Sequence, residues 1–309
     1  MDRLSSFFRT RYVLVTCIVI LSVFLRFWAA DNLRTDFDEP VYLGNAFDYA
    51  AMIRTGDWDS VIDYREVIEH PPLVKLLYSL PILTMGEQAD WSSALFISRM
   101  VSVVFGALAV LLLALIDPLA GGLLAVQTLV VKYTSQAYLE ALPLFAMILS
   151  VYALLRSKRA LDGWFWLSAA ALGLTAAGKY SYAPILFVIL YLYFSEKKYR
   201  WRELVVYLLV IGITFWVLNP TLYRDPLNRL YESLFFHPGY AQSQHVQTSG
   251  YNWYQPLLWV SRSWVYEWHP GEIFYYGFDG LIFIFGIIGL RFEWFQRRWV
   301  VVWIVTSMA

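Results

Sequence analysis

The sequence predicts an all-α integral membrane protein: a bundle of about eight or nine transmembrane helices with amphipathic surface helices in its first extracytosolic loop. Composition is the first reason. Apolar residues make up 59% of the 309 residues and charged residues 16%, against about 45–50% and about 25% in soluble domains. A succession of long apolar runs is the second reason, and the placement of basic residues between those runs is the third.

Several apolar runs reach or approach the about 20 residues that cross a bilayer. They are residues 12–30, 92–116, 118–133, 137–156, 163–178, 182–195, 203–219, 274–290 and 298–309. The first run lacks a small-residue cleavage site after a short apolar core, so we interpret it as a retained signal anchor. The last run is short, and we expect either an abbreviated final helix or a chain cut relative to longer relatives.

Basic residues predict the orientation. If the N-terminus is cytoplasmic, strict alternation of the spans places every basic cluster on the cytoplasmic side, as the positive-inside rule requires. The clusters are Arg3, Arg9 and Arg11; Arg156, Lys158 and Arg159; Lys197, Lys198, Arg200 and Arg202; and Arg291, Arg297 and Arg298. Residues 1–309 then form a single transmembrane domain whose two long polar segments, 31–91 and 220–273, share the extracytosolic face.

The first polar segment is rich in acidic residues and contains two stretches with apolar residues at helical spacing. These stretches are Val41 to Ile53, and Leu73 to Leu83 behind Pro71-Pro72, where prolines suit a helix start. We expect both to be amphipathic helices that lie along the membrane surface. The net charge of zero favours no polyanionic partner, so we expect no nucleic-acid binding.

Two groups of residues in this segment could carry chemistry. Asp38-Glu39 is a carboxylate pair close to the first apolar run, where a base could deprotonate an acceptor hydroxyl during glycosyl transfer. The alternative is that the pair is solvated loop charge. Glu69-His70, stiffened by two prolines, could bind a divalent metal ion or a phosphate, or could simply form a turn before a helix.

Ionisable residues inside or at the ends of apolar runs form the next group, because such residues are costly in lipid and normally face a site or a protein interior. They are Arg26, Arg99, Glu140 and Lys179. For Arg26 and Lys179 the alternative is snorkelling to lipid head groups. Three histidines of the second polar segment, His237, His245 and His269, do not have the spacing of metal ligands, and we interpret them as loop residues.

The order of these motifs resembles the protein O-mannosyltransferase family. More broadly, it resembles the C-type glycosyltransferases that use polyprenyl-phosphate sugars, including the aminoarabinose transferases that act on lipid A. The stretches that carry the resemblance are residues 35–44 (TDFDEPVYLG), 69–77 (EHPPLVKLL), 138–145 (YLEALPLF), Gly178-Lys179-Tyr180, Asn219-Pro220 and Arg224-Asp225-Pro226. One departure is that Glu140 stands where relatives have Asp.

The resemblance implies a role for each matching residue. Asp38 matches the general base and Glu39 supports it. Glu69 matches a position linked to metal or acceptor binding, and His70 lies near the donor phosphate. The remaining residues implied in binding the substrate or its lipid phosphate are Arg99, Glu140, Lys179 and Tyr180. No cofactor is certain, and a divalent metal ion at Glu69 is the only candidate.

The leading hypothesis is an inverting glycosyltransferase that moves a sugar, mannose or another hexose, from a polyprenyl-phosphate or dolichyl-phosphate carrier to an acceptor hydroxyl. The acceptor would be a protein, a glycan or a lipid, and the active site would face the extracytosolic side of a multi-pass membrane protein. A transporter or flippase of a lipid-linked or small substrate is the first alternative. A catalytically inactive scaffold, or a subunit of a larger transferase, is the second.

Overall fold

The computed structural model describes residues 2–195, 200–240, 242, 244–249, 254, 258, 261, 278–296 and 298–308. Within these residues every regular element is helical. The α-helices are α1 (Asp2–Asn32), α2 (Glu39–Thr55), α3 (Trp58–Asp63), α4 (Leu73–Met85), α5 (Trp91–Ile116), α6 (Pro118–Val126), α7 (Thr128–Tyr133), α8 (Ala141–Arg156), α9 (Gly163–Gly178), α10 (Ile185–Ser195), α11 (Trp201–Val217), α12 (Pro226–Tyr240), α13 (Gln244–Ser249), α15 (Phe278–Gln296) and α16 (Arg298–Met308). Short 3₁₀ helices are η1 (Gly86–Gln88), η2 (Tyr180–Tyr182) and η3 (Pro220–Leu222).

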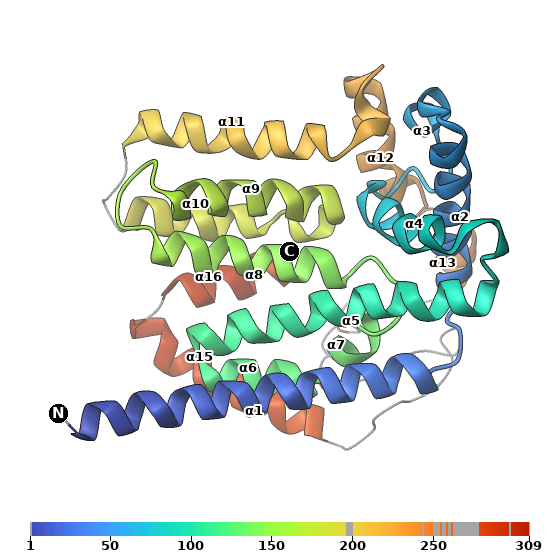
Figure 1. Ribbon diagram of the computed structural model, residues 1–309. Helices are drawn as coiled ribbons and strands as arrows, with labels where there is room; N and C mark the ends of the chain where they lie inside the picture. Colours follow the sequence, from blue (N-terminus) through green and yellow to red (C-terminus); the bar gives the residue numbers. More distant parts are fainter. Residues whose placement is uncertain are drawn as a thin grey trace.

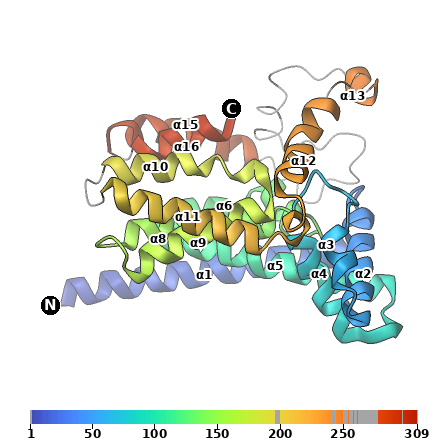
Figure 2. The ribbon, with the colours of Figure 1, turned by 90° about the horizontal axis from the view of Figure 1, so that it is seen from above.

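Helices α1, α5, α6, α8, α9, α10 and α11 lie side by side with roughly parallel axes (Figure 1). Helices α2, α3, α4 and α12 gather at one end of this bundle, where α1 ends and α5 begins. The described parts of the two polar segments therefore lie at the same end of the bundle. Figure 2 shows the same end from another side, with α12 next to α3.

Among the described residues, two helical stretches are long and apolar enough to cross a membrane, namely Thr10–Asn32 and Trp91–Ile116. The other bundle helices are shorter, and α8 to α11 do not exceed 17 residues. The bundle is thus all-helical, with two members of full spanning length packed against each other.

The apolar run 118–133 is broken, which corrects the expectation of one continuous helix. Helix α6 ends at Val126, and Gln127 has extended backbone angles and caps α7 by accepting from the N–H of Val130. The carbonyls of Leu124 and Ala125 at the end of α6 accept hydrogen bonds from the guanidinium of Arg26. Such a break is tolerated in an apolar bundle because a polar side chain satisfies the freed backbone groups.

Arg26 is fully buried and therefore does not snorkel to a surface. Besides the two carbonyls, it donates to the hydroxyls of Ser22 (2.7 Å) and Thr134 (2.9 Å), and so joins α1 to the α6–α7 region. A Cβ added at Gly106 of α5 would come within 2.8 Å of the Arg26 Nε. The glycine is what lets α5 approach this guanidinium.

Both predicted helices of the first polar segment form, as α2 and α4. Their apolar stripes pack on each other and on the end of the bundle. Tyr42, Leu43 and Ala46 of α2 and Tyr78 and Ile82 of α4 are all buried in this shared core. The expected surface helices are therefore a packed cap over the bundle, because each apolar stripe finds protein rather than lipid to cover it.

Candidate active site

The segment between α1 and α2 is held by two buried ion pairs. The carboxylate of Asp36 lies 2.8 Å from the ammonium of Lys132, and both side chains are at most 2% exposed. The carboxylate of Glu39 accepts from Arg99 at both oxygens, at 2.8 and 2.6 Å, and from the backbone N–H of Ala137 at 2.7 Å. Two anions of this segment are thus neutralised by cations from other helices.

Arg99 differs from its expected role. Its Nε and both terminal nitrogens donate to Glu39 and to the carbonyls of Ala30, Leu33 and Arg34, and it is 4% exposed. These bonds use all five N–H groups of a guanidinium. Arg99 therefore ties the end of α1 to the start of α2, and this arrangement does not favour its expected contact with a lipid phosphate.

Asp38 lies between the two ion-paired residues and is half-buried. It occupies the N-cap position of α2, but its carboxylate makes no capping hydrogen bond. An Asp at an N-cap usually accepts from the N–H groups of the first turn. Its backbone N–H points to the hydroxyl of Tyr138 at 3.5 Å. The carboxylate that the sequence predicts as a base is therefore not a capping group of α2.

A second group of predicted residues lines a cleft of about 240 Å³, here called the Lys179 cleft. Its lining residues are Glu69, His70, Lys179, Tyr180, Ser181, Ser233 and Leu234. Glu140 joins the group, because its carboxylate lies 2.5 Å from the ammonium of Lys179. The structure thus brings together side chains from the first polar segment, from the ends of α8 and α9, and from α12.

Tyr42 connects Asp38 with the Lys179 cleft. Its ring lies against the rings of His70 and Tyr138, with centroids 6.1 and 5.9 Å apart. Burial raises the pKa of the Tyr42 phenol above its ordinary value, and three nearby carboxylates raise it further. Those carboxylates are Asp38, Glu140 and Glu69. The Asp38 segment and the cleft therefore form one neighbourhood, with acidic groups around a buried aromatic side chain.

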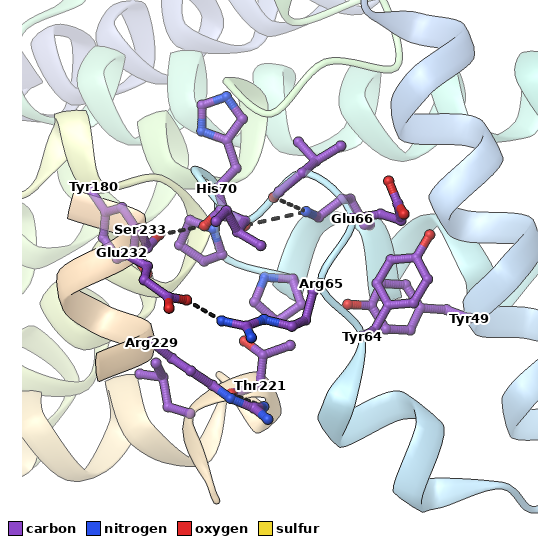
Figure 3. Close-up of a pocket in the computed structure, with 16 residues that line it drawn as sticks. Tyr49, Tyr64, Arg65, Glu66, His70, Tyr180, Thr221, Arg229, Glu232 and Ser233 are labelled. Carbon is purple, nitrogen blue, oxygen red and sulfur yellow. Dashed lines mark hydrogen bonds and ion pairs between the residues drawn. The ribbon is translucent and has the colours of Figure 1, made fainter. Parts of the chain in front are cut away.

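A polar pocket adjoins the cleft and shares His70, Tyr180 and Ser233 with it. Figure 3 shows this pocket between the loop that carries Arg65 and the helix that carries Glu232, with an ion pair between those two side chains. Its volume is about 30 Å³, against about 240 Å³ for the Lys179 cleft. It is a narrow polar extension of the cleft.

The structure does not fit a metal ion at Glu69. Among the described residues, no three His, Cys, Asp or Glu side chains gather in a way that could hold one. Glu69 and His70 line the cleft, and the carboxylate of Glu140 is paired with Lys179, which also lines it. The side chains of His237 and His245, and all of His269, lie outside the described residues, as do the basic residues Lys197, Lys198 and Arg297.

Sequence reasoning missed the Asp36–Lys132 pair and the cleft residue Ser233. A signal for the pair was present, because Lys132 is an ionisable residue near the end of the apolar run 118–133 and such a residue needs a partner. Ser233 had no signal. It comes from α12, more than 160 residues after the turn whose Ile68 carbonyl accepts from its hydroxyl.

Comparisons with known proteins support the fold. No family model and no curated relative matches the chain. Among solved structures, the S. cerevisiae protein O-mannosyltransferase Pmt1–Pmt2 complex bound to the sugar donor is similar, with a TM-score of 0.50 and 18% identity over 73% of this chain and 34% of that chain. The present chain thus spans about a third of the matched one. This likeness shows a fold similar to that of part of this O-mannosyltransferase complex.

Proposed function

We propose that this protein is an inverting glycosyltransferase that moves a hexose, mannose in the first instance, from a polyprenyl-phosphate carrier to an acceptor hydroxyl. One observation carries the proposal. The carboxylate of Asp38 lies close enough to Tyr42 to raise the pKa of its phenol, and the ring of Tyr42 lies against His70, which lines the cleft that also contains Lys179. A base and a phosphate-binding cation at one end of a C-type fold are the two groups that this reaction needs.

In the proposed reaction, the acceptor oxygen attacks the anomeric carbon of the sugar, and Asp38 takes the proton of that hydroxyl. The bond between the anomeric carbon and the phosphate oxygen breaks, and its electron pair leaves with the phosphate. Lys179 and His70 stabilise the charge that develops on that phosphate. A single displacement of this kind inverts the configuration at the anomeric carbon.

Glu140 would hold Lys179 in place until the donor arrives. One oxygen of Glu140 contacts the Lys179 ammonium at 2.5 Å, and the other is buried without a hydrogen-bond partner among the described residues. A donor hydroxyl could satisfy that second oxygen, because a carboxylate accepts at both oxygens. The pair would then bind the phosphate through its cation and the sugar through its anion.

The lipid part of the donor requires a membrane, and α1 and α5 are long and apolar enough to cross one. We place the reaction on the extracytosolic face, since the end of the bundle with the site is opposite to the end with the basic cluster Arg156, Lys158 and Arg159. The acceptor would be a protein, glycan or lipid hydroxyl that reaches the cleft from that face.

The test is sugar transfer by the purified protein in detergent, with radiolabelled polyprenyl-phosphate mannose and a crude extract as acceptor. We expect Asp38→Asn to lower transfer by about 10²-fold or more, with an unchanged unfolding temperature. Asp31→Asn, the same substitution at an exposed position of the same segment, should keep full activity. Full activity of Asp38→Asn would refute the role of Asp38. Uptake into proteoliposomes without any transfer product would favour a transporter.

A further inference from the structure

Residues 66–70, here called the Glu69 turn, carry Glu69 and His70 to the Lys179 cleft without any regular helix to support them. Val67 adopts a positive φ of 55° within this turn. A positive φ is unusual for a β-branched residue, because its Cβ crowds the backbone in the left-handed region. Such a conformation persists only when the surrounding structure holds it.

Lys75, in the first turn of α4, supplies this hold. Its side chain is 1% exposed, and its ammonium donates to the carbonyl of Val67 at 3.0 Å and to that of His70 at 3.2 Å. These two carbonyls bracket Ile68 and Glu69. Both acceptors found among the described residues are backbone groups of the turn, so the ammonium fixes the course of the backbone on each side of Glu69.

The turn is also held from α12. The hydroxyl of Ser233 donates to the carbonyl of Ile68 at 2.5 Å. The carbonyls of three of the five residues of the turn therefore accept from side chains of α4 and α12, two helices that lie far from each other in the sequence. The contribution of Lys75 differs from that of Ser233 because its donor is charged and makes two hydrogen bonds to the turn instead of one.

We propose that Lys75 is the positioning residue of the cleft: through the carbonyls of Val67 and His70 it sets where Glu69 and His70 meet the substrate. The inference rests on the proposed function for the identity of that substrate, a polyprenyl-phosphate sugar. A buried ammonium is a costly way to support a fold, since an apolar side chain of similar length packs without desolvating a charge. The desolvation of this ammonium is offset where the charge is needed to fix the backbone of a binding site in one geometry.

The first test measures how well the backbone of the Glu69 turn is held, and it does not require sugar transfer. Hydrogen exchange of the 66–70 amides, followed by mass spectrometry, should become at least about tenfold faster in Lys75→Met than in the wild type. Lys75→Gln, which keeps two N–H donors on a shorter side chain, should be intermediate and serves if Lys75→Met does not fold. Ser79→Ala is the matched control, because Ser79 is buried one turn later on α4 and, among the described residues, donates to Leu76 of the same helix. Unchanged exchange in both Lys75 variants would overturn the proposal.

The second test asks whether Lys75 acts through the turn during catalysis. We expect Lys75→Met to lower kcat/KM by about 10- to 100-fold in the wild-type background, but by less than about threefold in a background that carries both Glu69→Ala and His70→Ala. Equal losses in both backgrounds would assign Lys75 a general structural role and overturn the positioning role. If the wild type transferred no sugar from any donor, the proposed function would fail, while the exchange experiment would still decide whether Lys75 holds the turn.

Discussion

The first polar segment is joined to the rest of the protein by two sets of ion pairs that differ in burial. The set near Asp38 is buried, with side chains at most 4% exposed. The set between α3 and the η3–α12 region is largely exposed, with most of its side chains more than 40% exposed. The buried pairs are Asp36–Lys132 and Glu39–Arg99; the exposed pairs are Arg224–Asp59, Arg224–Asp63, Arg229–Asp63 and Arg65–Glu232.

The difference in burial between the two sets predicts which parts of this end of the molecule are held firmly and which are held weakly. A buried pair loses several kcal/mol when one partner is removed, since the other charge is left without water or counter-ion. An exposed pair is screened by solvent and contributes little. The segment that carries Asp38 is therefore held by the strong set. Helix α12, which lines the Lys179 cleft through Ser233 and Leu234, is held to α3 by the weak set.

Breaking the buried set should have the largest effect. Arg99→Met leaves Glu39 as an unpaired buried carboxylate, so we expect a loss of about 3–5 kcal/mol of stability and loss of transfer. Thermal unfolding in detergent checks the first effect and the transfer assay checks the second. Arg54→Met, at an exposed position near the end of α2, should change neither. A wild-type unfolding curve for Arg99→Met would contradict the comparison.

Lys75 is a third kind of buried cation, because it donates to backbone carbonyls instead of pairing with a carboxylate. It can therefore be compared with Arg99 and Lys132. Burial lowers the pKa of Lys75 to about 8, and Glu69 opposes this change. Between that value and the unfolded value of 10.5, the unfolded state binds more protons than the folded state. Stability from this group is therefore present above the unfolded pKa, and is lost as the pH falls through the folded pKa.

We thus expect the unfolding temperature to rise with pH from about 8 to about 10, and Lys75→Met to remove that rise. Other titratable or charged side chains that line the same pocket are Tyr49, Tyr64, Arg65, Glu66, His70, Tyr180, Arg229 and Glu232. The variant controls for all of them, since it changes the lysine alone. The same rise in Lys75→Met would assign the pH dependence to one of these groups.

The exposed set should give the smallest effect. Arg224→Ala removes the contacts with Asp59 and Asp63, and we expect at most about a quarter of the stability loss of Arg99→Met. That small loss should vanish in about 1 M salt, where the Debye length is about 3 Å. Arg54→Ala, measured under the same two conditions, is the control. A large, salt-independent loss for Arg224→Ala would show that exposure does not separate the two sets.

Much of the architecture could be predicted from residue order. The apolar runs gave the bundle helices to within a few residues in α5, α9 and α11, and the two stretches at helical spacing became α2 and α4. The run 118–133 could not be predicted as two helices, because its break depends on the Arg26 side chain of another helix. That the apolar stripes of α2 and α4 pack on one another could not be predicted for a similar reason, because the contact joins two separate helices.

The sequence by itself determined the class of fold, the gathering of both polar segments at one end, and the set of candidate residues, because hydropathy and charge act locally along the chain. Tertiary structure alone decided which charges neutralise each other. It joined Glu39 to Arg99 and Asp36 to Lys132, and it brought Asp38 near Tyr42. The physical reason is that a charge is stabilised by whichever group lies within a few ångströms of it in space, and packing, not sequence order, sets that distance.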